Sequence, residues 1–480
     1  MSRKYRIKFC DKVLDPVHGF IDLTEVESKL IELPIFKRMQ SIKQLSLTNW
    51  IFPGAEHTRY IHSFGVMYIA DLMAQQLLYS DEERQLVRLA GLLHDIGHYP
   101  LSHVTESVYC DNLTRTDDVL EKHNGKVIKK VDELCEFSFP DNMKSRKNQK
   151  THHESIGATV IRTDNDIKEI IEKYCPFIEI EDICDIIVGC VDRKPEISGL
   201  VQLIHSELDA DGIDYVMRDS TFSGTCYGGF ELGLLLRNLV RKKVKGVEII
   251  GIKPKGISIA DQYLISKYFS YTQIVFNKHV SVLETMAEFI TTEMIRNSTI
   301  GYPDKEDLLS YAKAHNEDPF YLSFTDTQFW SHLEDVLLHR GPVKPYLFNM
   351  TQKLSEYQEL VVKDNEFVIT SNNKANVQKA LKNSQIYKDL CKNRTNTLVL
   401  FQERGFTAQM PKKEFVNLLN TLRGGKCALE ELEKESIKRL QESVTVIDGR
   451  KVKALVDCPT SIMSHLYGTR TYILREYNVS

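Results

Sequence analysis

The sequence lacks the long apolar runs, paired cysteines and charge excess that mark several protein classes. No apolar run approaches the ~18 residues of a membrane span, and the basic N-terminus has no apolar stretch behind it, so we expect neither a membrane segment nor a signal peptide. The ten cysteines are scattered without a C-x-x-C pair, as in a cytoplasmic protein with reduced thiols. A formal net charge of −4 gives no general attraction for nucleic acid.

Histidine, by contrast, is concentrated in one part of the chain. Eight of the fifteen histidines lie between residues 57 and 153. In residues 92–103 (LLHDIGHYPLSH) an apolar helical run ends at adjacent His94 and Asp95, and Gly97 is the expected helix stop. Taken singly, a histidine here is as well explained by a helix C-terminal cation or a surface polar residue as by a metal ligand. An imidazole beside a carboxylate at a helix end, with further histidines nearby, predicts a metal site.

Hydrophobic periodicity divides the chain into two parts with a boundary near residue 300. Residues 1–300 are predicted to form a mainly α-helical domain with a small β-hairpin, built from Val244–Ile252 and Ile257–Ile259 around a Lys255-Gly256 turn. The polar stretch 111–150 predicts a mobile insertion. Residues 301–480 mix helical patches with strand-like pieces, which predicts a C-terminal α+β domain whose role the pattern does not define.

Two further metal ligands are expected on neighbouring helices. His62 lies in the first turn of the helix predicted before the one that ends at His94, and an antiparallel pair would bring the two together. Asp211, Tyr215 and Asp219 fall at i, i+4 and i+8, on one face of another predicted helix. Two histidines and two aspartates, including Asp95, suit a divalent Mn, Fe, Zn or Mg ion. The other charged residues of that helix are expected to form salt bridges.

The ordered set His62, His94-Asp95 and Asp211 resembles the four metal ligands of the HD-domain phosphohydrolase superfamily. The stretches at 15–19, 36–45 and 52–62 are similar to one branch, the deoxynucleoside triphosphate triphosphohydrolases, which includes dGTPases and the sterile-alpha-motif-linked HD type. The resemblance covers roughly residues 10–295. It implies a helical bundle, a divalent metal ion, a nucleotide substrate and a homo-oligomer, dimeric or larger.

The resemblance also implies roles for other side chains. His103 and Glu106, at i, i+3 on a new helix, match a His-acid dyad that protonates the leaving 5′-oxygen. His98 and His153 match residues that contact the phosphates. The expected substrate-binding residues, covering the α-phosphate, the sugar and the phosphate tail, are Gln44, Leu45, Arg59, Tyr215, Asp219, Lys267 and Lys278. A tyrosine ring closing over C2′ would select deoxyribose over ribose.

Several positions depart from the family pattern. Gly212 stands where relatives carry Lys or Arg, and Lys267 replaces an Arg. Val275 and Asn277 replace the Tyr and His of a Tyr-x-His-Lys pattern that ends at Lys278. Relatives that are regulated by guanine nucleotide carry Asp, Gln and Arg where this chain has Glu32, Lys37 and Gln40. Activation by a guanine nucleotide is therefore poorly supported. The reaction class therefore carries over better than the substrate.

Three functions fit these residues. The leading hypothesis is hydrolysis of a deoxynucleoside triphosphate to deoxynucleoside and tripolyphosphate. The second keeps the enzyme but changes the substrate to a monophosphate, a cyclic or signalling nucleotide, or an oligonucleotide end. The third is a non-catalytic nucleotide-binding regulator, which would have little use for the dyad of His103 and Glu106.

Overall fold

The computed structural model describes most of the chain in seven segments: residues 5–110, 152–296, 301–338, 345–356, 362–390, 397–422 and 428–478. The mobile insertion predicted at 111–150 lies outside these residues. No helix within the described segments combines the length and the apolar character needed to cross a bilayer.

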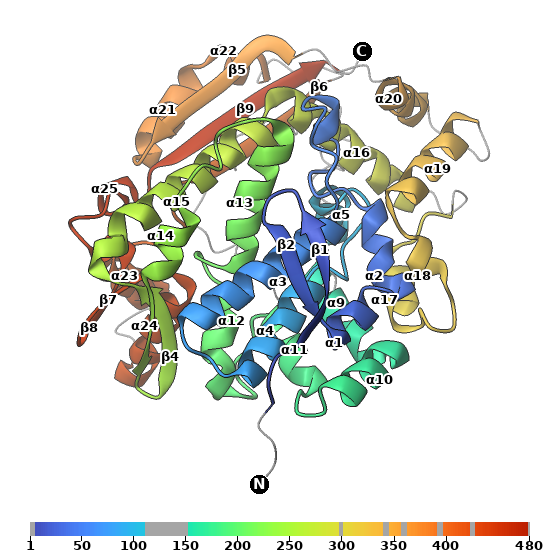
Figure 1. Ribbon diagram of the computed structural model, residues 1–480. Coiled ribbons are helices and arrows are strands. Elements are labelled where there is room, and N and C mark those ends of the chain that lie inside the picture. The colour runs from blue at the N-terminus through green and yellow to red at the C-terminus, as the bar shows by residue number, and fades with distance from the viewer. Residues whose placement is uncertain are drawn as a thin grey trace.

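Packed helices make up most of the described residues before 300 (Figure 1). Helices α3 and α4 run side by side in opposite directions, and α13 crosses α3. A capping box starts α4, because Ser80 Oγ accepts from the Glu83 amide and the Glu83 carboxylate accepts from the Ser80 amide. The helices are α1 Glu25–Leu30, α2 Pro34–Lys37, α3 Arg59–Gln76, α4 Asp81–Leu93, α5 His103–Cys110, α9 His153–Thr163, α10 Asn165–Tyr174, α11 Ile180–Ile187, α12 Ser198–Ile204, α13 Ala210–Ser223, α14 Leu232–Arg237, α15 Ile257–Ser270 and α16 Lys278–Arg296.

The predicted β-hairpin exists, but its predicted position is wrong. Strands β3 (Leu239–Val244) and β4 (Val247–Ile252) are antiparallel and turn at Lys245 and Gly246, which have φ of 51° and 86°. Two residues at positive φ form the tight turn that matches the twist of a hairpin. The second Lys-Gly pair, in the 3-10 turn Pro254–Gly256, leads instead into α15, because a proline in the first turn favours a helix start.

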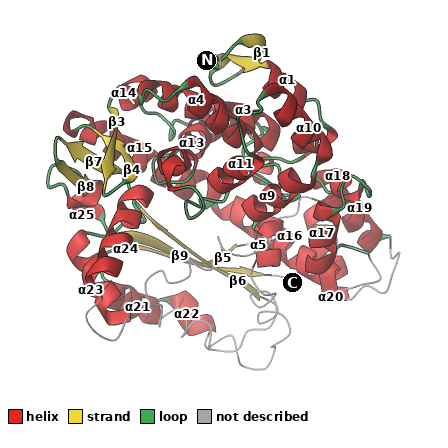
Figure 2. Cartoon of the chain, turned by 90° about the horizontal axis from the view of Figure 1, so that it is seen from below, coloured by secondary structure: helices red, strands yellow, loops and turns green. Residues whose placement is uncertain are grey.

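The residues after 300 form an α+β region, as predicted (Figure 2). Strand β9 (Arg470–Asn478) is the centre of a sheet and pairs antiparallel with β5 (Val362–Ser371) and β6 (Thr397–Gly405). Strands β7 (Thr445–Asp448) and β8 (Lys451–Ala454) extend the β3–β4 hairpin into a second sheet. The helices are α17 Lys305–Lys313, α18 Phe320–Ser323, α19 Asp326–Leu337, α20 Pro345–Ser355, α21 Lys374–Asn383, α22 Gln385–Leu390, α23 Lys412–Leu422, α24 Leu429–Glu442 and α25 Met463–Leu466.

A continuous cluster of buried apolar side chains runs through both parts of the chain. Members from α3 and α4, such as Met67 and Leu89, belong to the same cluster as Tyr321, Phe324 and Phe329 from the later region. The helices that carry the predicted ligands are therefore packed on both sides. Such packing restricts side-chain motion, which a site with defined geometry requires.

Candidate metal centre and active site

Three predicted ligands from three different helices meet at one point. His62 lies in the first turn of α3, His94 is the C-terminal cap of α4, and Asp211 lies in the first turn of α13. Ligand atoms of these three residues lie within 4.8 Å of one another. The Nε2 atom of His62 is 3.0 Å from Asp211 Oδ1, and His94 Nε2 is 3.9 Å from the same oxygen. These distances leave room for an ion between the donors.

Asp95, the fourth predicted ligand, faces the same point. Its Oδ1 lies 3.4 Å from His94 Nε2, and its Oδ2 lies 3.9 Å from His62 Nε2. Burial by itself raises the pKa of this carboxyl, but Arg59 and the surrounding histidines lower it further, so the net pKa lies well below its usual range. Asp95 is therefore ionised, as a metal ligand must be.

The second nitrogen of each candidate ligand imidazole is tied to the protein. His94 Nδ1 lies 2.8 Å from the Gly91 carbonyl, and His62 Nδ1 lies 2.7 Å from Asp214 Oδ2. His94 Nε2 is buried and has no hydrogen-bond partner within the described part of the chain. An imidazole that donates through Nδ1 and presents a bare, buried Nε2 is arranged as in metal sites. The donor set thus fits a divalent cation of the Mn, Fe, Zn or Mg type.

A buried charge network holds Asp214, and the sequence analysis did not identify its function. Arg218 donates to both oxygens of Asp214, at 2.7 and 3.0 Å, and to Asp15 at 2.7 Å. His18 contacts Asp214 from the turn between β1 (Phe9–Asp15) and β2 (Gly19–Thr24). Asp214 and Arg218 were expected to form a salt bridge, and they do. In the sequence, two features indicated the other contacts of this network: the i, i+4 spacing of Asp214 and Arg218, and the Asp-Pro-Val-His-Gly turn at 15–19.

A second cluster beside the metal group is organised around one carboxylate. Glu106 Oε2 lies 2.7 Å from His103 Nδ1, and Glu106 Oε1 lies 2.8 Å from His153 Nδ1. Interactions with His153 and His103 hold the pKa of Glu106 well below its usual range despite its burial. His103 presents a side chain that is 65% exposed, whereas His153 is buried with its Nε2 3.9 Å from Asp95 Oδ1. The predicted dyad is thus formed, and it shares its acid with His153.

His98 completes this cluster. Its ring stacks on His153 at 4.3 Å between centroids and meets His103 edge-on at 4.8 Å. Burial, together with the nearby Arg59, keeps the pKa of His98 well below its usual value, so the ring is neutral. Its Nε2 is buried and lacks a hydrogen-bond partner among the described residues. A neutral imidazole with an unused ring nitrogen can donate to a phosphate oxygen.

The loop that carries these histidines is held from outside. Leu101 and Ser102 have positive φ values of 52° and 54°, which non-glycine residues adopt only when their surroundings require it. Asp326 accepts from the Leu101 amide at 2.7 Å and from the Lys43 amide at 3.0 Å. The buried guanidinium of Arg38 donates to the carbonyls of Ile96, His98 and Phe324. The later part of the chain therefore fixes the loop.

The predicted sugar-binding residues fall in two groups. Asp219 Oδ1 lies 2.9 Å from His57 Nε2, and the backbone N–H of Gln44 donates to the backbone carbonyl of His57 at 3.0 Å. Gln44 Oε1 is buried and has no hydrogen-bond partner within the described segments. Leu45 is partly buried next to this group, and Tyr215 lies one helical turn before Asp219. His57 was not predicted as a site residue, although it lies in a stretch that carries the family resemblance.

The three predicted cationic residues, Arg59, Lys267 and Lys278, lie in different surroundings. Arg59 does not project freely toward a substrate, because it donates to Asp95 at 2.9 Å and to Ser102 at 3.1 Å. Lys267 lies on α15 with its Nζ 5.5 Å from the centroid of the Tyr215 ring. Lys278 is the first residue of α16. A π-helical turn at Tyr271–Val275 separates α15 from α16.

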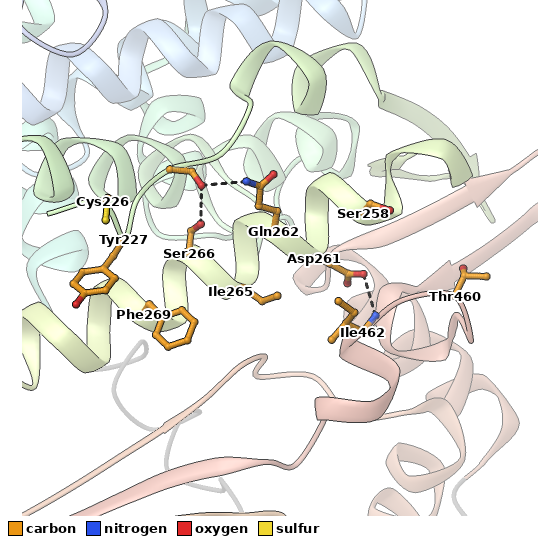
Figure 3. A pocket seen from close by; sticks show the side chains of 11 residues that line it. Cys226, Tyr227, Ser258, Asp261, Gln262, Ile265, Ser266, Phe269, Thr460 and Ile462 are labelled. Carbon is orange, nitrogen blue, oxygen red and sulfur yellow. Dashed lines mark hydrogen bonds between the residues drawn. The ribbon is translucent and has the colours of Figure 1, made fainter.

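A cavity of about 560 Å³ lies on the other face of α15 (Figure 3). It is lined by residues of α15 such as Gln262, Ile265 and Phe269, and by Ile462 near α25. Asp261 closes one end by accepting from the Ile462 amide at 3.0 Å. Positions 262, 265 and 269 share one helix face, whereas Lys267 lies on another. This cavity is therefore separate from the metal group.

Comparison with known proteins identifies one domain of the chain. A family model described as the HD domain matches residues 59–205, which contain three of the four converging ligands. This part of the chain is therefore an HD domain. It is 26% identical over 374 residues to an uncharacterized protein of Bacillus subtilis, spanning 72% of this chain and 74% of that one.

Two further similarities bear on the fold and the reaction class. A chicken protein named deoxynucleoside triphosphate triphosphohydrolase SAMHD1 is 30% identical over 230 residues, which are 43% of this chain and 33% of that protein. A crystal structure of a hypothetical protein from Aquifex aeolicus superposes with a TM-score of 0.63 at 20% identity, covering 97% of this chain and 96% of the other. The fold thus extends to both regions of the chain, while the chain spans only a third of the chicken relative.

Proposed function

We propose that this chain is a metal-dependent phosphohydrolase that converts deoxynucleoside triphosphates to deoxynucleoside and tripolyphosphate. The observation that carries the proposal is the pairing of two clusters. The first is the group of His62, His94 and Asp211, and the second is the pair of imidazoles bridged by Glu106. The clusters adjoin at Asp95, 3.9 Å from His153 Nε2. A site that only binds nucleotide would need the first cluster but not the second.

In this proposal His62, His94, Asp95 and Asp211 hold the ion. A divalent ion bound there would supply a Lewis acid for a phosphoryl oxygen and lower the pKa of a bound water toward ~7. The exposed His103 donates a proton to the leaving 5′-oxygen when water attacks the α-phosphorus and the P–O5′ bond breaks. Glu106 orients His103 and stabilises its protonated form. His98 and His153 hold phosphate oxygens.

The sugar would lie between two groups of side chains. Asp219, oriented by His57, accepts a hydrogen bond from the 3′-hydroxyl, and Gln44 has a free buried oxygen close by. Tyr215, one helical turn from Asp219, closes over C2′ and leaves no room for a 2′-hydroxyl. This arrangement supports deoxyribose selection. A cytoplasmic location and a homo-oligomer remain predictions from the sequence and from the resemblance.

The test is product analysis with purified full-length protein and Mn²⁺. Each deoxynucleoside triphosphate is incubated beside its ribonucleotide counterpart and its monophosphate, and the products are resolved by chromatography. We expect deoxynucleoside and tripolyphosphate from the deoxy substrates. His94→Ala removes a ligand and abolishes the reaction, whereas the matched His332→Ala, on α19 and bonded to the Gln328 carbonyl, retains it. A lack of nucleoside product with every metal tried refutes the proposal.

A monophosphate is the second candidate substrate. Gly212 and the replacements at Val275 and Asn277 remove cationic or aromatic groups that relatives place near the phosphate tail. Each lost charge-assisted contact typically forfeits about 1.5–3 kcal/mol. Hydrolysis of the monophosphate with triphosphates untouched, in the same panel, favours this candidate.

A further inference from the structure

The C-terminal sheet is fixed against helix α15 next to the candidate site. The Tyr268 and Thr471 hydroxyl oxygens lie 2.5 Å apart, and the Phe406 ring stacks on the Tyr268 ring with centroids 3.9 Å apart. Tyr268 belongs to α15, and Thr471 belongs to the central strand β9. The residue paired with Thr471 on the neighbouring strand β6 is Arg404. These contacts hold the end of β6, and with it Arg404, close to α15.

Lys267 lies close to the Tyr215 ring, and Arg404 lies over the neighbouring Tyr271 ring. The guanidinium carbon of Arg404 lies 3.6 Å from the centroid of the Tyr271 ring, and Tyr271 meets Tyr215 edge-on at 6.1 Å between centroids. Lys267 Nζ lies 5.5 Å from the Tyr215 centroid. Burial raises the pKa of Tyr215 well above its ordinary value, and Arg404 is the positive charge that opposes this rise. One cation therefore comes from α15 and the other from the C-terminal sheet.

Asp209 is the carboxylate beside Lys267, since a Cβ added to Gly212 would be 2.7 Å from Asp209 Oδ1 and 3.1 Å from Lys267 Nζ. Within the described part of the chain, Arg404 forms no ion pair, while its strand neighbour Glu403 pairs with Arg470 at 2.9 Å. The carboxylate of Glu207 accepts instead from Thr407 Oγ1 at 2.6 Å. Lys267 lies 3.5 Å from a backbone carbonyl. One carboxylate beside two cations leaves a net positive charge, and a bound anion would offset it.

The position of Lys267 relates this charge to the metal group. Its Nζ would be 3.1 Å from a Cβ added to Gly212, the residue that follows Asp211. Lys267 thus occupies space beside the position where relatives carry a basic side chain. The positive charge of Lys267 therefore lies next to the candidate ligand Asp211, where it could meet a chain of phosphates whose first member is at the metal.

We propose that Arg404, delivered by the C-terminal sheet, forms with Lys267 an anion subsite for the distal phosphates of the substrate. The proposal rests on the proposed function for the identity of the anion, a polyphosphate attached to a nucleoside. It gives residues 301–480 a direct part in substrate recognition. The Arg404 guanidinium stacks by its face on Tyr271, and its N–H groups have no hydrogen-bond partner among the described residues, so they can bond a phosphate in a forked manner.

Binding of inorganic tripolyphosphate to the full-length, Mn²⁺-loaded protein tests this subsite by calorimetry. We expect Arg404→Ala to weaken tripolyphosphate binding about tenfold or more, the effect of losing one charge-assisted contact. Orthophosphate, which needs only the position at the metal, should bind within about twofold of the wild type. Arg470→Ala is the matched control, because it removes the same charge from the adjacent strand at a guanidinium paired with Glu403.

Arg404→Gln serves as a second variant in case the alanine variant fails to fold, since an amide can still lie over Tyr271. The proposal is overturned if both soluble variants bind tripolyphosphate as tightly as the wild type, or if Arg470→Ala causes the same loss. Turnover is measured separately, with the expectation that KM for the triphosphate rises more than kcat falls. Arg404-dependent tripolyphosphate binding without any dNTP hydrolysis would refute the proposed function and leave the subsite standing. Hydrolysis of dNTPs with a KM that does not depend on Arg404 would refute the subsite and leave the proposed function standing.

Discussion

Adding one methyl group at Gly65 should damage the metal site from behind. Gly65 lies in α3, one turn after His62, where the helix passes α13. A Cβ at this position would be 1.9 Å from Asp214 Oδ1 and 2.5 Å from Arg218 Nη2. Both side chains are fully buried, and Asp214 is the group that bonds His62 Nδ1. Gly65→Ala must therefore displace the carboxylate that orients a metal ligand.

Gly65→Ala should lower the free energy of unfolding, whereas a Gly→Ala change in an ordinary helix raises it. Helix propensity alone favours alanine over glycine by about 1 kcal/mol. Breaking a buried ion pair costs about 3–5 kcal/mol, so we expect the free energy of unfolding to fall by about 2–4 kcal/mol. Loss of the carboxylate behind a ligating histidine should also weaken metal binding about 10–100-fold.

Urea denaturation and Mn²⁺ titration of the purified variant measure the two effects. The control is Gly233→Ala, in exposed helix α14, where an added Cβ meets nothing within 4 Å. That variant should equal or exceed the wild type in stability, by up to about 1 kcal/mol. The reasoning is refuted if Gly65→Ala is as stable as the wild type and binds Mn²⁺ with unchanged affinity.

Three further outcomes follow from the site. Glu106→Gln should lower kcat by about 100-fold or more at unchanged metal content, because an amide cannot accept from two imidazoles; kinetics beside elemental analysis check this, and an unaltered kcat contradicts it. Burial lowers the pKa of His62, but Asp211 and Asp214 raise it further, to about 10. A bound metal displaces this proton, so Mn²⁺ affinity should rise as pH rises toward that value; calorimetry between about pH 6 and pH 9 in two buffers measures it, and a flat profile argues against it. Chelation should lower the free energy of unfolding by about 2.7 kcal/mol relative to protein with metal at about 100 times Kd, while His94→Ala should show no such response in thermal denaturation.

The metal group was largely predictable from the sequence because its parts obey local rules. His94 and Asp95 are adjacent, and the two other expected ligands lie in the first turns of strongly patterned helices. An antiparallel pair of helices joined by a short loop has few arrangements, and all of them bring the start of one near the end of the other. The structure brings these residues together, as the distances among His62, His94 and Asp211 record.

The support behind the ligands was not predictable in the same way. Contact of Asp214 with His62 depends on how α13 is rotated against α3, across 152 residues of sequence. Only a residue without a side chain at Gly65 allows that approach. Asp15 and His18 come from a turn near the N-terminus and reach the same carboxylate or its partner Arg218. No local pattern encodes such long-range partners.

The strands show a similar division. The hairpin was misplaced because two Lys-Gly pairs ten residues apart look alike, and only the backbone at Lys245 and Gly246 adopts positive φ. Strand β9 has a weak apolar pattern, although it is central to its sheet, because charged residues interrupt it. One of them, Arg475, is buried and bonds Glu366 at 2.6 Å. An arginine that is buried in such an ion pair makes a central strand look like an exposed segment.

The hold on the histidine loop has a consequence for modularity. Arg38 donates to Phe324, 286 residues away, and Asp326 fixes Leu101, 225 residues away. The span that matches the HD family model, 59–205, contains neither anchor. Excised on its own, that span would leave Leu101 and Ser102 free to relax from positive φ, and the imidazoles would lose their shared orientation. The HD span of this chain is therefore not a portable catalytic unit, and replacing the downstream segment would retune the active site without altering a single residue within it.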